Sequence, residues 1–86
     1  MILPLYGFVE GDTLGLLVLA EEDDTMATLA DKLQAAASVR VAPRARVKVV
    51  VDGRAVPPEV TVRVAGLRPL QRIDLVEDAS DAEDAE

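Results

Sequence analysis

Residues 24–53, DTMATLADKLQAAASVRVAPRARVKVVVDG, decide the fold that this sequence predicts. From Met26 to Leu33, apolar residues recur with helical spacing, which indicates an amphipathic helix that buries one face. Asp24 or Thr25 can cap its first turn, because a side-chain oxygen there can accept a hydrogen bond from a free backbone amide. The stripe that we expect to be buried consists of Met26, Leu29, Ala30 and Leu33, extended by Ala36 or Ala37.

The second half of this stretch predicts a buried strand. The helix must stop before Pro43, because the proline ring disfavours a helical conformation at Ala42 and proline has no amide hydrogen to donate. The Val-rich run of residues 47–51 follows, with Val47, Val49 and Val51 on one face. Asp52-Gly53 then predicts a tight hairpin turn.

Toward the N-terminus, two apolar runs flank Glu10-Gly11-Asp12 and predict a β-hairpin. Gly7 and Gly15 lie inside these strands, where glycine often marks a bulge or the close approach of another backbone. Either glycine could be where a partner contacts the chain, but we favour a bulge that curves the sheet over the helix. The side chains predicted to face inward are Leu3, Leu5 and Val9 from the first strand, and Leu14, Leu16, Val18 and Ala20 from the second.

Toward the C-terminus, residues 54–56 predict a short edge strand. Thr61 can cap one helical turn that Gly66 ends, and a last strand carries Ile73. The predicted order is therefore strand, strand, helix, strand, strand, turn, strand. It indicates one α+β domain, residues 1–76, with a mixed sheet of about five strands packed on one helix. We expect Leu29, Leu33, Val49 and Ile73 at the centre of the core, and Gln34 exposed.

Charge divides the chain into regions. The net charge is −7, and the C-terminal residues 77–86 carry no large apolar side chain, so we expect a disordered acidic tail there. This tail can serve as an electrostatic arm or as a solubilising extension. The segment between the predicted helix and the tail is basic. Its cations are Arg40, Arg44, Arg46, Lys48, Arg54, Arg63, Arg68 and Arg72.

Composition leaves little for catalysis. The chain has no His and no Cys, so its Ser and Thr hydroxyls have no imidazole base, and a Cys- or His-ligated metal site is excluded. The run of carboxylates at residues 21–24 lacks the ligand spacing and turn glycine of a calcium loop. We predict no catalytic, cofactor-binding or metal-binding residue.

No apolar run is long enough to span a membrane, and the first residues lack the charged region of a signal peptide, so we expect a cytoplasmic protein. Nucleic-acid binding through the basic segment is disfavoured, because the net charge is negative and Tyr6 and Phe8 are the only aromatics. Of the function classes considered, protein binding remains. Arginine is enriched at interfaces, and we expect Arg40, Arg44, Arg46 and Arg68 to border a contact with a larger acidic or polar partner.

The whole pattern resembles a ubiquitin-like β-grasp, although the Gly-Gly end of conjugated modifiers is absent from this chain. The sequence is also similar to the gamma subunit of toluene and alkene monooxygenase hydroxylases, the toluene monooxygenase system B family. The stretches that carry this similarity are Leu3-Pro4-Leu5, Glu10-Gly11-Asp12, Asp24-Thr25-Met26, Ala30-Asp31-Lys32, Arg40-Val41-Ala42-Pro43-Arg44, Ala65-Gly66-Leu67-Arg68-Pro69 and Ile73-Asp74.

This resemblance implies a non-catalytic subunit that docks on a diiron alpha subunit. Hydroxylases of this type pair alpha, beta and gamma chains as a dimer of trimers, with a carboxylate- and His-bridged diiron centre inside alpha. An effector protein, a Rieske ferredoxin and an NADH-dependent reductase complete the system, which uses dioxygen to oxidise an aromatic ring or an alkene. The alternative that the residues leave open is a free-standing ubiquitin-like adaptor.

Overall fold

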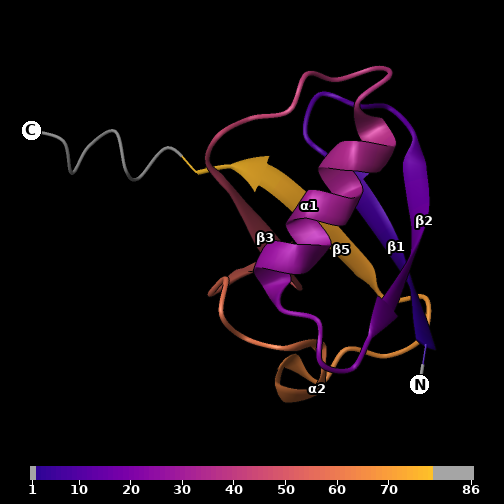
Figure 1. Cartoon of the computed structure of the whole chain (residues 1–86), viewed down its shortest axis with the longest axis vertical. Helices are drawn as coiled ribbons and strands as arrows, with labels where there is room; N and C mark the ends of the chain where they lie inside the picture. Colours follow the sequence, from indigo (N-terminus) through magenta and orange to yellow (C-terminus); the bar gives the residue numbers. More distant parts are fainter. Residues whose placement is uncertain (1, 79–86) are drawn as a thin grey trace, which may run out of the picture.

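A computed structural model describes residues 2–78 of the chain. Five strands form one sheet in the order β2-β1-β5-β3-β4, and helix α1 crosses one of its faces (Figure 1). The β1–β5 pair is parallel and the other pairs are antiparallel, which confirms the mixed ubiquitin-like sheet. The elements are β1 (Ile2–Val9), β2 (Gly15–Glu21), α1 (Met26–Ala37), β3 (Val47–Val51), β4 (Arg54–Val56), α2 (Val62–Ala65) and β5 (Arg72–Glu77).

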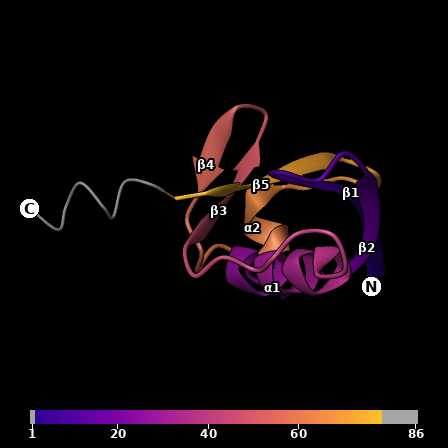
Figure 2. The ribbon, with the colours of Figure 1, turned by 90° about the horizontal axis from the view of Figure 1, so that it is seen from above.

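Helix α1 begins where its cap predicts. Thr25 is the N-cap, and its Oγ1 accepts a hydrogen bond from the Thr28 amide. Asp24 has another role in the preceding turn, where its carboxylate accepts from the Glu21 amide at 2.9 Å. At the other end of the apolar stripe Ala37 is buried and Ala36 is exposed. Figure 2 shows α1 and the sheet as two layers, with β2 curving toward the helix at one edge.

The core lies between these two layers. Leu29 and Leu33 of α1, Val49 of β3 and Ile73 of β5 are all buried, as the sequence predicts. Around the core, local geometry follows the expected turns: Asp52 and Gly53 have positive φ angles of 52° and 81°. Thr61 caps α2, and Gly66 ends it in the left-handed conformation. Among the described residues, no helix is both long and apolar enough to cross a membrane.

The glycines in the first hairpin mark close packing and not bulges. Strands β1 and β2 pair residue by residue from Ile2 opposite Glu21 to Phe8 opposite Gly15, with no extra residue on either strand. A β-carbon at Gly7 would collide with the Leu33 side chain of α1, and one at Gly15 would press on the rings of Tyr6 and Phe8. The predicted bulges are therefore wrong, and Gly7 is where the helix approaches the sheet.

Two boundaries differ from prediction. Leu14 precedes β2 and is exposed, because its amide donates to the Asp12 carboxylate and becomes part of the turn. Strand β5 extends to Glu77, which pairs with Val47 and which the sequence assigned to the acidic tail. The rest of that predicted tail, from residue 79 onward, lies outside the described residues.

Candidate protein-interaction surface

Arg40 holds the loop after α1 against the first hairpin. Its Nε donates to both carboxylate oxygens of Asp12 at 3.0 and 3.1 Å, and its Nη2 donates to Oδ2 at 2.8 Å. This contact is the main reason why the pKa of Asp12 is lowered and that of Arg40 is raised. The Asp12 side chain is only 1% exposed, whereas that of Arg40 is 34% exposed. The pair therefore presents its guanidinium to solvent and shields its carboxylate.

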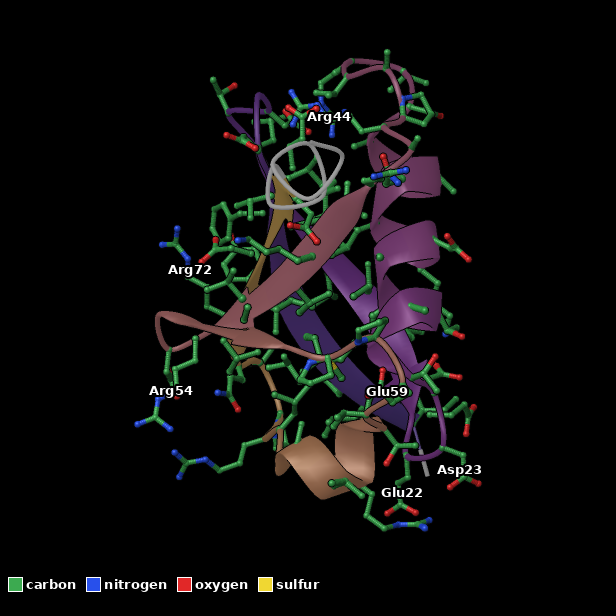
Figure 3. The ribbon with its side chains drawn as sticks, turned by 90° about the vertical axis from the view of Figure 1, so that its left-hand side faces the viewer. Glu22, Asp23, Arg44, Arg54, Glu59 and Arg72 are labelled. Carbon is green, nitrogen blue, oxygen red and sulfur yellow. The ribbon has the colours of Figure 1, made fainter. Side chains whose placement is uncertain are left out.

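Arg44 makes a second link at the same end of the molecule (Figure 3). Its Nη1 donates to Glu10 Oε1 at 3.3 Å, and the same oxygen accepts the Glu77 amide at 2.8 Å. The backbone of Arg44 exchanges two hydrogen bonds with the Gln34 side chain, which is therefore half-buried and not exposed as predicted. These bonds join the loop, the hairpin and the end of β5.

The four arginines predicted to border an interface do not form one group. Arg46 follows Arg44 in the same loop, and its carbonyl accepts the Asp78 amide beside the end of β5. Arg68 lies at the other end of β1, two residues before Leu70, whose amide donates to the Pro4 carbonyl. Its own amide donates to the Gln71 side chain. The structure thus places three arginines past the end of β1 and the fourth near its start.

An apolar surface that the sequence analysis did not predict lies between the two ends of β1. Residues of β1 and β2 whose side chains alternate with the buried ones lie on the sheet face turned away from α1. Their register places Tyr6 beside Leu17 and Pro4 beside Leu19. Leu17 is 62% exposed and Leu19 is 56% exposed. We call this surface the β1–β2 outer face, and it consists of Ile2, Pro4, Tyr6, Phe8, Leu17 and Leu19.

A signal for this face was present in the sequence. Strands with one solvated face normally alternate apolar and polar residues, but Pro4, Tyr6, Phe8, Leu17 and Leu19 make both faces of this hairpin apolar. Eight large hydrophobic side chains are exposed in the described part of the chain, and four of them belong to this face. Such a concentration is typical of a protein-binding surface.

The acidic run before α1 is used within the chain. Asp24 pairs with Lys32 at 2.8 Å, and its pKa is lowered first by the hydrogen bond from the Glu21 amide and then by Lys32. Glu22 pairs with Arg63 at 3.0 Å, which lowers the pKa of Glu22. Among residues 2–78, no group of three or more His, Cys, Asp or Glu side chains is placed to hold a metal ion.

The hollows among residues 2–78 do not enclose a site for a small substrate. A slot between α1 and β3–β4 has a volume of about 90 Å³ and is lined by Met26, Ala30, Val49 and Val56 among others. Ligand pockets usually measure about 300–1,000 Å³. Two other hollows are larger, about 340 Å³ beside Phe8, Arg72 and Asp74 and about 510 Å³ beside Asp52, Arg68 and Gln71, but both are shallow and open to solvent. The geometry therefore favours contact with another protein over binding of a small molecule.

Comparison with known proteins agrees with this geometry. The family model described as toluene-4-monooxygenase system protein B matches residues 2–76. A chain from a toluene 4-monooxygenase HD complex with the inhibitor 4-bromobenzoate is similar over 91% of this chain and 100% of its own length, with 29% identity and a TM-score of 0.84. A ubiquitin of Caldiarchaeum subterraneum covers 91% and 95% of the two chains, with 15% identity and a TM-score of 0.74. No curated protein sequence matched the chain.

Proposed function

The chain belongs to the toluene-4-monooxygenase system protein B family, and from this premise we propose that it is the non-catalytic gamma subunit of a diiron monooxygenase hydroxylase. The observation that carries the proposal is the extent of the match, which spans residues 2–76 and so includes almost all of the described fold. The similar chain from a toluene 4-monooxygenase complex supports the same role. In this role the chain docks on the alpha subunit and stabilises it.

The donor set supports a role without metal chemistry. A carboxylate-bridged diiron site in a helix bundle takes Glu and His ligands from several helices. This chain has no His, and helix α1 uses its inward side for apolar packing. We therefore propose that the alpha subunit holds the iron, carries out the dioxygen chemistry and binds the aromatic or alkene hydrocarbon. Electrons from NADH would reach that subunit through the reductase and the Rieske ferredoxin.

The proposed assembly is a cytoplasmic dimer of alpha–beta–gamma trimers. We also propose that Arg40, Arg44, Arg46 and Arg68 border the contact with alpha. Because the first three lie past one end of β1 and Arg68 lies near its other end, a contact that follows β1 would be bordered at both ends. Arg40 keeps exposed surface while it pairs with Asp12, so it can hold the loop in place and also contact a partner.

Expression of the hydroxylase with and without this chain tests the proposed function. Without it, we expect lower yield and weaker cohesion of alpha and beta, because a partner that binds only the folded form stabilises that form by mass action. Iron per folded alpha subunit should stay unchanged. If iron is lost while alpha remains folded, the chain shapes the metal site and the purely structural role is wrong. If yield, cohesion and turnover are all unchanged, the chain is not a subunit of this hydroxylase.

A further inference from the structure

The β1–β2 outer face meets solvent at the open edge of the sheet. Strand β2 pairs with β1 alone and is therefore an edge strand, as Figure 1 shows. The ring centres of Tyr6 and Phe8 lie 5.2 Å apart, and across the strands Tyr6 is opposite Leu17 and Pro4 is opposite Leu19. An exposed apolar face beside a free strand edge can accept another chain in two ways: by strand addition at the edge, or by side-chain packing on the face.

The free edge is partly closed to strand addition. The Tyr6 amide donates toward β5, to the Gln71 carbonyl, so the paired residue Leu17 turns its own backbone groups to the open edge. Leu19 and Glu21, which alternate with it, face the same way. Lys32 Nζ donates to the Leu19 carbonyl at 2.9 Å, and Asp24 accepts the Glu21 amide. An added strand could pair only near Gly15 and Leu17, which favours side-chain packing.

Charges at the border favour a partner with carboxylates. Arg72 lies 4.2 Å from the centre of the Phe8 ring and pairs with Asp74 through Nε at 3.2 Å. The Arg72 side chain is 65% exposed and that of Asp74 is 34% exposed. As in the Arg40–Asp12 pair, the guanidinium is the more exposed partner. After one such contact an arginine still has N–H donors that can bind a carboxylate. A second copy of the chain would bring the same arginines to a shared isologous interface.

We propose that the β1–β2 outer face docks on a surface of the alpha subunit that has an apolar centre and carboxylates at its rim, packing through side chains and without strand addition. This proposal rests on the proposed function. Tyr6, Leu17 and Leu19 supply the apolar contact, and Arg72 and Arg40 pair with the rim carboxylates. The face lies between the arginines at the two ends of β1, so one continuous contact can include both.

Co-purification with a tagged alpha subunit tests the face. Leu17→Glu and Leu19→Glu place a charge on exposed positions, so the full-length variants should melt within a few degrees of the wild type. Each should bind alpha roughly tenfold or more weakly, because a charge at the centre of an apolar contact must be desolvated. The matched control is Val64→Glu, another exposed apolar position, on α2. Arg72→Glu should weaken binding more than Arg54→Glu, which changes an exposed arginine on β4.

The outcomes separate the two proposals. If the wild type binds alpha and the Leu17→Glu and Leu19→Glu variants bind it equally well, the docking face is wrong and the subunit role stands. Failure of the wild type to bind alpha under any condition would overturn both. A wild-type homodimer that Leu17→Glu dissociates, seen by sedimentation, would assign the face to a second copy of the chain. Equal losses from Arg72→Glu and Arg54→Glu would overturn the acidic rim.

Discussion

Gly7 is the residue at which the helix and the sheet come closest. A β-carbon there would collide with Leu33, which is fully buried and surrounded by the core. The sequence shows a glycine inside a strand but does not show what lies above it. That neighbour depends on the angle at which α1 crosses the sheet, which no local pattern specifies.

Gly7→Ala should therefore destabilise the protein. We expect a loss of about 1–3 kcal/mol in the free energy of unfolding, the usual cost of overpacking a core. This cost exceeds the roughly 0.5–1 kcal/mol that alanine gains over glycine through lower backbone entropy. Chemical denaturation measures it. In a Leu33→Ala background the same change should cost less, because the colliding side chain is gone; equal costs in both backgrounds would contradict the assigned contact.

The Arg40–Asp12 pair should make stability depend on pH. The pKa of Asp12 is lowered from its ordinary value of 3.8, first by the hydrogen bond from Arg40. A lowered pKa in the folded state stabilises the protein above the unfolded value and loses this contribution as the pH falls through the folded value. Asp12→Asn should therefore reduce the free energy of unfolding at neutral pH, and the difference from wild type should shrink below about pH 3.8.

Denaturation midpoints across the acidic range measure this difference. Arg40→Gln removes the partner and keeps the carboxylate, so it should reproduce the loss at neutral pH. A deficit of the same size at every pH would show that Asp12 acts through packing or through the turn hydrogen bond to Leu14, and not through its charge.

At the scale of elements, α1 was predicted closely because its signals are local. Thr25 and the apolar stripe that follows it lie within residues 25–37, and Asp52 and Gly53 are adjacent in the β-turn. The interaction surface was predicted less well. Whether Tyr6 and Leu17 lie side by side depends on strand register, and the partners of Arg40 and Arg44 come from the hairpin, 28 and 34 residues earlier in the chain.

Leu33→Ala tests the packing of α1. Leu33 is fully buried between the helix and the sheet, so truncation should cost about 2–5 kcal/mol, the range for buried leucine. Gln34 is unsuitable as an exposed control, because its side chain holds the Arg44 backbone. Asp31→Ala, at an exposed position on the same helix, is the matched control. Equal denaturation midpoints for the two variants would contradict the helix orientation.

At the scale of the whole molecule, residues 1–78 and the residues that follow Asp78 differ in charge. Twelve of the sixteen acidic residues lie within residues 1–78, together with all nine basic residues. Within the described part, Lys32, Arg40, Arg44 and Arg63 take part in ion pairs that join separate elements, such as α2 to the β2–α1 turn. The four remaining carboxylates follow Asp78, so removing residues 79–86 changes the net charge from −7 to −3.

From the proposed function, we expect a chain truncated after Asp78 and the full chain to support assembly of the hydroxylase equally well. The cut keeps the Asp78 amide, which bonds to the Arg46 carbonyl, and the Glu77 amide, which bonds to Glu10; a cut after Val76 would remove both and loosen the end of β5. The removed residues contain no large apolar side chain, so the melting temperature should stay within a few degrees.

The test is to co-express alpha and beta with each version of the chain. The subunit ratio and the turnover are then measured at low and at high salt. A loss of assembly that occurs only at low salt would assign residues 79–86 an electrostatic role, because salt screens interactions between exposed charges. A loss at every salt concentration would show instead that the tail makes a specific contact with its partner.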